Sequence, residues 1–377
     1  MIRKNSVDDN SDLLSYTINI LNQKYGLDIK IDIVQDSKIL PHIKKRIMSI
    51  NYNIRLATLF ALYNFGNAEL IIKYYLTHKF LSYNLYDEAE NWLRQTISKS
   101  NKILIKSKVN STSFFHKNIY RYNINKDEIL KFQQLFVLLH EYSHGLFYQK
   151  EDIRNYYFDI IKNSLNELES AKNDKEGVLS AISKELHWGS RSFLMEVIGY
   201  GFVNRNLDLI PSIYNDIRKI EEFACDLHAW NVLISILHYG GFSLKEQIVM
   251  FTKAIEALYY LENYKAVDDC LSYKIDMNKA ENISLFDSIR YSILTYKTVL
   301  YLEGKEKGKG FAFDKQFSLF RWNERYEFIK VITKYLPLSA QLKEGAKITI
   351  NKEQSISIYE KINNFEESFL IKSGFKC

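Results

Sequence analysis

Apolar residues recur every three to four positions along most of the chain, the spacing that one face of an α-helix buries. The helices predicted in this way cover residues 10–25, most of 54–98, 125–148, parts of 152–202, 215–237, 243–263, 281–302 and 317–335. Asn125 or Asp127 is a suitable cap for the third of these, and Gly240-Gly241 ends the helix that begins near Asn215.

A second pattern, alternation of apolar and polar residues, predicts a few strands. Leu27 to Val34 alternates, Ile103 to Val109 alternates apolar with basic residues, and 114–124 is rich in aromatic residues. We expect 103–109 and 114–124 to pair as antiparallel strands, and Ala346 to Ile350 is also strand-like. The predicted fold is mostly α with a small antiparallel β-sheet.

Composition favours a folded, helical protein. Hydrophobic residues make up 46% and charged residues 25% of the 377 residues, and only 3 Pro and 14 Gly interrupt the helical patterns. A net charge of +6 spread over this length, without a nucleic-acid-binding motif, predicts a solvated basic surface and no nucleic-acid function.

Several features favour a reducing, cytoplasmic setting. The three cysteines, Cys225, Cys270 and Cys377, are too scattered for a disulfide framework or a Cys-type zinc site. The first ten residues are polar and charged, unlike a secretory signal. The most apolar window, 54–76, carries Arg55 and several other polar residues, so we expect a buried or amphipathic helix and no membrane span.

The strongest chemical signal is His140-Glu141-Tyr142-Ser143-His144. On a helix, His140 and His144 lie on one face, one turn apart, where two imidazoles can bind one zinc ion. Glu141, next to the first histidine, can act as the base on a zinc-bound water that attacks a peptide carbonyl. Apolar residues on both sides of the motif predict a buried helix. The alternative interpretation is that the histidines are ordinary helix residues facing polar neighbours.

A catalytic zinc ion needs a third protein ligand and one open position. In the short pattern His-Glu-x-x-His-x-x-Gly-x-x-His a third histidine binds the ion, but this chain has Phe147 and Lys150 at the Gly and last His positions. The third ligand is therefore expected in the predicted helix after 215. Glu222 and Asp226 are four residues apart there. We expect Glu222 to bind zinc and Asp226 to accept a hydrogen bond from the far ring nitrogen of a ligand histidine, most simply His140.

Several other residues are alternatives for the ligand and supporting roles. Glu221 is the alternative third ligand, but its partner four residues on is Cys225 rather than an acid, so its replacement should change little. Cys225 is expected to be a small core residue, and His228 to point away from the site. Glu196 is the next candidate ligand, although a paired structural acid is the simpler role, and His187 is expected to be packed. The sequence does not single out a residue that would stabilise an oxyanion.

The two motifs together resemble a known group. His-Glu-x-x-His followed by Glu-x-x-x-Asp looks like the gluzincin metallopeptidases, and Glu222-Phe-Ala-Cys225-Asp226-Leu-His-Ala229 resembles the second motif of the HtpX/Ste24-type and ImmA/IrrE-type peptidases. The chain departs from them in the long gap between His144 and Glu222 and in Cys225, where Ala is commoner. A helical, cytoplasmic chain of this size with this motif is also similar in type to the phage-exclusion Lit peptidases.

The resemblance implies a zincin-like metallopeptidase core with helical insertions. Residues 101–242 would form this core, between a mainly helical region at 1–100 and a C-terminal helical region at 243–377. The implied function is zinc-dependent hydrolysis of a peptide bond in a cytoplasmic protein or peptide substrate. Two alternatives stay open: a narrow-specificity phage-defence or toxin peptidase with the same chemistry, and a non-catalytic regulatory protein stabilised by zinc. The intact Glu141 argues against the last of these. The oligomeric state does not follow from the sequence.

Overall fold

The computed structural model describes residues 10–34, 42–44, 47–51, 53–64, 67–109, 126–173, 210–243 and 351–374, with single positions between 246 and 342. Most of this part of the chain is α-helical. The helices are α1 (Asn10–Tyr25), α2 (Asn53–Asn64), α3 (Ala68–Ser82), α4 (Tyr86–Val109), α6 (Lys126–Gln149), α7 (Glu151–Asn173), α10 (Ile210–Tyr214), α11 (Ile217–Tyr239) and α16 (Lys352–Lys372). The strands are β1 (Lys30–Val34), β2 (His42–Lys44) and β3 (Ile47–Asn51).

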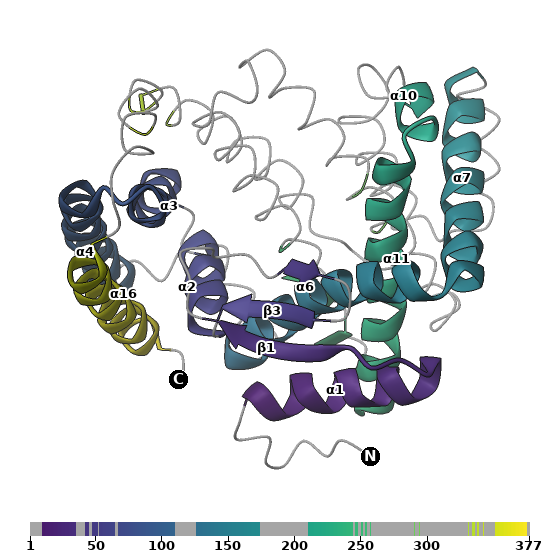
Figure 1. Cartoon of the computed structure of the whole chain (residues 1–377), viewed down its shortest axis with the longest axis horizontal. Helices are drawn as coiled ribbons and strands as arrows, with labels where there is room; N and C mark the ends of the chain where they lie inside the picture. The colour runs from purple at the N-terminus through teal and green to yellow at the C-terminus, as the bar shows by residue number, and fades with distance from the viewer. Residues whose placement is uncertain are drawn as a thin grey trace.

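Helix α6 lies at the centre of the structure (Figure 1). It contacts α1, α2, α7, α11 and β2, and almost every residue from Ile129 to Phe147 is buried or half-buried. A helix that is apolar nearly all round is stable only when other elements cover all its faces. The sequence around the histidine motif therefore places α6 inside the core, with its acidic first turn, Asp127 and Glu128, favourable at the positive end of the helix dipole.

A small mixed sheet packs against the same helix. Its strand order is β1-β3-β2, with β1 parallel to β3 and β2 antiparallel to β3. Gly145 of α6 leaves room for the side-chain ends of Ile43 and Ile29, which would have to shift to accommodate a Cβ at this position. Glycine thus lets β2 lie directly on the turn of α6 that follows His144.

The prediction of an antiparallel sheet at 103–124 is wrong for the first of its two strands, 103–109. Residues 103–109 continue α4, and 114–124 lie outside the described residues. Alternation of apolar and basic residues is weak evidence here, because no Gly or Pro breaks the helix that begins at Tyr86. Leu93, Ile97 and Leu104 extend a helical stripe through this segment, and Leu104 is buried while Ile105 is exposed.

Other predicted elements have mixed outcomes. The helices at 10–25, 125–148 and 215–237 and the strand near 27–34 are confirmed within a few residues. The apolar window 54–76 forms two helices, α2 and α3, and the Asn67 side chain caps the second by accepting from the backbone N–H of Leu70. None of the described helices combines the length and apolar character that crossing a membrane requires. Strands β2 and β3 and helix α16 were not predicted, and the predicted strand at 346–350 lies outside the described residues.

Helix α16 is held to the N-terminal helices by a buried carboxylate. Glu366 accepts a hydrogen bond from the Tyr74 hydroxyl at 2.6 Å and lies 3.7 Å from the Nε of Arg55, which is also buried. His78 Nε2 is 3.5 Å from the same oxygen, and burial lowers the pKa of His78. A carboxylate this deeply buried is stable only when paired, so Glu366 fixes α16 against α2 and α3.

We predict that Glu366→Ala destabilises the protein by about 3–5 kcal/mol, because it leaves the Arg55 charge buried without its carboxylate. Urea denaturation of both proteins measures this difference. Glu360→Ala, an exposed position on the same helix, is the matched control and should change the free energy of unfolding by no more than about 0.5 kcal/mol. Equal effects of the two substitutions would contradict the buried ion pair.

Candidate metal centre

The site is built from two helices, α6 and α11. Helix α11 is capped at its N-terminus by Asp216, whose side chain accepts from the backbone N–H of Arg218, and at its C-terminus by Gly240. The small residues Ala224, Cys225 and Ala229 are fully buried, which allows α11 to pack closely against α6. This packing brings Glu221, Glu222 and Asp226 to the face of α6 that carries the two histidines.

Three side chains form a group that could hold a metal ion: His140, His144 and Glu222. The Nε2 atoms of His140 and His144 are 3.3 Å apart. Glu222 Oε2 lies 3.4 Å from Nε2 of His140, and Glu222 Oε1 lies 3.7 Å from Nε2 of His144. The sequence predicted the same three residues as ligands, and the fold brings them together across 78 positions of the chain.

The spacing of these donor atoms fits a tetrahedral ion. Two nitrogen ligands at about 2.0–2.1 Å from a tetrahedral zinc ion are about 3.3–3.4 Å apart, which is the separation of the two Nε2 atoms. Two imidazoles and one carboxylate are also ligands that zinc accepts. The residues present therefore suit a divalent ion of the zinc type without rearrangement of the helices.

The far nitrogen of His140 is held by a buried ion-pair network. His140 Nδ1 donates to Asp226 Oδ1 at 2.7 Å. The guanidinium of Arg290 donates to both oxygens of Asp226, at 2.6 and 2.9 Å, and its terminal nitrogen lies 3.4 Å from Glu222 Oε2. Asp226 and Arg290 are 2% and 3% exposed, so this pairing takes place away from solvent.

The network explains the charge state of Asp226. Burial alone would raise the pKa of this carboxyl, but Arg290 and His140 outweigh burial and hold the pKa below its ordinary value. The ionised carboxylate then keeps the proton of His140 on Nδ1, so Nε2 faces His144 and Glu222. Arg290 was not singled out from the sequence, because nothing in the predicted helix at 281–302 relates it to Asp226, 64 positions away.

Glu221 holds the second histidine in the same way. His144 Nδ1 donates to Glu221 Oε1 at 2.9 Å. The expectation that replacing Glu221 would change little is therefore not supported: the carboxylate is not one of the three converging donors, but it orients one of them. The buried thiol of Cys225 lies close enough to His144 and Glu221 to form a second possible ligand group with them.

The site favours a positive charge at its centre. Burial would lower the pKa of His140, but Asp226 and Glu222 outweigh it and raise this pKa to about 10. Burial would raise the pKa of Glu222, but the hydrogen bond from His140 and the charges of Arg290 and the two histidines lower it strongly. His140 therefore carries a proton on both ring nitrogens in the metal-free protein. The proton on Nε2 lies among the donor atoms that would surround a cation.

Glu141 is half-buried and follows the first histidine directly. Burial raises the pKa of the Cys225 thiol, and the charges of Glu222, Glu221, Asp226 and Glu141 add to this effect. The other two candidates, Glu196 and His187, lie outside the described residues.

His228 was expected to point away from the site; it stays out of the ligand group but faces α6, where it contacts Ser143 of the histidine motif. Ser143 donates its hydroxyl proton to the carbonyl of Leu139, so Ser143 Oγ accepts from His228 Nδ1 at 2.7 Å. The Tyr25 hydroxyl then donates to His228 Nε2 at 3.1 Å. Both ring nitrogens are satisfied in the neutral form, and burial lowers the pKa of His228 to about 3. This histidine joins α1, α6 and α11 and takes no part in the ligand group.

Comparison of the chain with protein-family models, with curated proteins and with solved structures finds no match.

We predict an order of zinc affinities for variants of the site. Glu222→Ala should lose most affinity, because it removes the only carboxylate among the three converging donors. Asp226→Asn and Glu221→Gln should each weaken binding by about 10–100-fold, because each removes the anion that orients a ligand imidazole. Competition with a chromophoric chelator measures these affinities, and Glu151→Gln, at an exposed position, is the control. Wild-type affinity in Glu221→Gln would show that His144 needs no such support.

We also predict that His228 contributes to acid sensitivity. Its pKa falls from about 6.5 in the unfolded chain to about 3 on folding, so its contribution to stability is complete above pH 6.5. As the pH falls from 6.5 towards 3, this residue alone should lower the free energy of unfolding by about 1.4 kcal/mol per pH unit. Urea denaturation of metal-free protein between pH 4 and 7 should give a shallower pH dependence for His228→Asn than for wild type. His238→Asn, an exposed histidine on the same helix, is the control, and identical slopes for all three proteins would refute the prediction.

Proposed function

We propose that the chain is a zinc-dependent metallopeptidase that hydrolyses a peptide bond in a protein or peptide substrate. The observation that carries the proposal is the convergence of Nε2 of His140, Nε2 of His144 and the Glu222 carboxylate on one point. Glu141, beside the first of these ligands, is the proposed general base. In the described part of the chain this group offers three protein ligands, the number that a catalytic zinc site uses when its fourth position is open.

The exposure of the ligands supports a catalytic site over a structural one. The side chains of His144 and Glu222 are 22% and 32% exposed, so the ligand group is open to solvent on that side. Structural zinc sites are closed by four ligands, mainly Cys and His. A purely structural zinc site would also have no need of a base at position 141.

A zinc ion bound here would act as a Lewis acid, lowering the pKa of water and polarising the substrate carbonyl. In the proposed reaction Glu141 accepts the proton of the attacking water and delivers it to the leaving amine. Asp226 and Glu221 keep both ligand imidazoles in the tautomer that presents Nε2. Arg290 keeps Asp226 ionised and restrains Glu222, and it is too deeply buried to contact a substrate.

The narrow-specificity alternative uses the same site. Roughly half of the chain lies outside the two motif helices and the elements beside them, and long insertions often restrict access to a cleft. We therefore expect a small set of cleavage sites rather than general digestion of unfolded proteins.

Glu141→Gln should abolish peptide hydrolysis while zinc stays bound, because it removes the proposed base and none of the ligands. The loss should be at least about 10²–10⁴-fold in rate. A comparison of wild-type and variant protein on a peptide library derived from a whole proteome, read by mass spectrometry, identifies cleaved bonds and measures the difference. Zinc content is determined on the same samples.

Glu128→Gln is the matched control, since Glu128 lies in the first turn of the same helix, three turns from the site. It should cleave the same peptides at the wild-type rate. Cleavage by Glu141→Gln at the wild-type rate would exclude the proposed base. Zinc bound by all three proteins without any cleavage by wild type would favour the non-catalytic alternative.

A further inference from the structure

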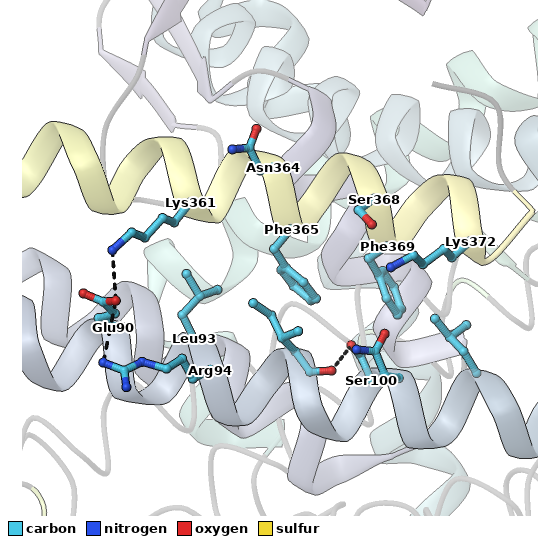
Figure 2. Close-up of a pocket in the computed structure, with 13 residues that line it drawn as sticks. Glu90, Leu93, Arg94, Ser100, Lys361, Asn364, Phe365, Ser368, Phe369 and Lys372 are labelled. Carbon is cyan, nitrogen blue, oxygen red and sulfur yellow. Dashed lines mark hydrogen bonds and ion pairs between the residues drawn. The ribbon is translucent and has the colours of Figure 1, made fainter.

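The hollow between α4 and α16 is a seam between two packed helices (Figure 2). Phe365 and Phe369 point from α16 towards α4 and are 7% and 2% exposed, so the fold already covers them. The exposed lining is polar, and Lys361 and Arg94 both lie beside Glu90, at 2.9 and 3.6 Å. This hollow therefore calls for no ligand, and the more informative cluster of side chains lies beside the metal centre.

A second group of ligand-type side chains shares His144 with the first group. Its members are His144, Glu221 and Cys225, whose ligand atoms all lie within 4.8 Å of one another. Glu221 Oε1 is 2.9 Å from Nδ1 of His144, whereas Nε2 of the same ring is 3.3 Å from Nε2 of His140. The second group can therefore bind an ion through the ring nitrogen that the first group leaves unused.

The spacing of residues on α11 explains why two groups arise. Glu221 and Cys225 are four residues apart, so they lie on one face of the helix, one turn apart. The same spacing, displaced by one residue, sets Glu222 and Asp226 beside His140. Helix α11 therefore presents two adjacent rows of side chains to α6, one row for each histidine.

The second group has a buried end and an open end. Cys225 is fully buried, and its thiol forms no disulfide. The side chains of His144 and Glu221 are 22% and 35% exposed, so the group is open to solvent on that side. A packing role needs only a small residue, as Ala224 and Ala229 on the same helix illustrate, whereas a sulfur at position 225 adds a metal ligand next to two others.

The three kinds of donor indicate which ion would bind. Thiolate sulfur, imidazole nitrogen and carboxylate oxygen are all ligands of zinc. Magnesium and calcium prefer oxygen ligands, so a group with one sulfur and one nitrogen selects against them. The group therefore suits a thiophilic divalent cation.

We propose that His144, Glu221 and Cys225 bind a second divalent cation of the zinc type, through Nδ1 of His144 and thus on the other side of its ring from the first ion. A coordinating sulfur binds as the thiolate, so the cation displaces the Sγ proton and the Nδ1 proton, and both protons leave to solvent. When both groups are occupied, the His144 imidazolate bridges the two ions through Nε2 and Nδ1.

Sharing His144 couples the two groups. Two cations on one imidazole ring repel each other, so each ion should bind more weakly when the other is present, and by the same factor. The second ion also takes the place of the proton that Nδ1 donates to Glu221. Zinc in excess would thereby adjust the centre that carries the proposed reaction. The second group itself does not rest on peptidase activity.

Titration of metal-free, full-length protein with Co²⁺, a coloured substitute for zinc, tests the proposal. The first group contains no sulfur, so a thiolate-to-cobalt charge-transfer band in the near ultraviolet reports the second group alone. Wild type should bind about two equivalents of Co²⁺ and show this band. Cys225→Ala should lose the band and bind about one equivalent, with the visible cobalt absorption of the first group retained.

Three further variants serve as controls. The chain has two other cysteines, Cys270 and Cys377, so the matched control carries Cys270→Ser and Cys377→Ser together and should keep both equivalents and the band. Glu222→Ala should weaken the first group and keep the band, which separates a failure of one group from a failure of the other. Cys225→Ser, which keeps a side chain of similar size, gives a second test at this buried position. Circular dichroism verifies that each variant is folded.

Several outcomes would overturn the proposal. Wild type without the band has no second ion at Cys225. The band together with a total of one equivalent would make Cys225 a ligand of the first ion instead. A band that persists in Cys225→Ala, or that disappears from the matched control, would belong to another cysteine. Two equivalents and the band in a protein that cleaves no peptide would support the second group while counting against the proposed function.

Discussion

The carboxylate of Asp226 is the group on which the arrangement of the site depends. An ionised carboxylate in the interior is strongly unfavourable unless it is paired and hydrogen-bonded. Asp226 meets this requirement only because His140 of α6 and Arg290 both donate to it. Three segments that are distant in the sequence must therefore meet at one point, and any displacement of α11 along α6 would leave a buried charge unpaired.

Because of helical periodicity, the packing of α11 on α6 positions several side chains at once. Residues four apart lie on one face, so Glu222 and Asp226 both face His140 while Glu221, one position away, reaches His144. His228, further along α11, bonds to Ser143 of α6 and Tyr25 of α1. Fixing α11 on α6 therefore positions a metal ligand, two supporting anions and a core hydrogen-bond network at the same time.

Local patterns in the sequence were sufficient for the parts of the structure that depend on helical spacing. The pairs His140/His144 and Glu222/Asp226 follow from a four-residue repeat, and the boundaries of α6 and α11 follow from capping and helix-ending residues. Arg290 and the role of Glu221 did not follow, because each depends on which residue the fold places opposite it. The strand predicted at 103–109 is wrong because alternation over a few residues is a weaker signal than the helical pattern that continues from Tyr86 without a Gly or Pro.

The side chains that hold the ligand residues in place also determine how much a metal ion contributes to the stability of the fold. In a small zinc-dependent domain the ion is required for folding, because the metal-free ligands have no other partners. Here the far nitrogens of both histidines are paired with carboxylates, Asp226 is paired with Arg290, and the proton on His140 supplies positive charge at the centre. The two helices are further held by an extensive apolar core, in which α6 is buried on several sides. The fold can therefore form before the metal binds, which leaves the three converging donors available to an ion.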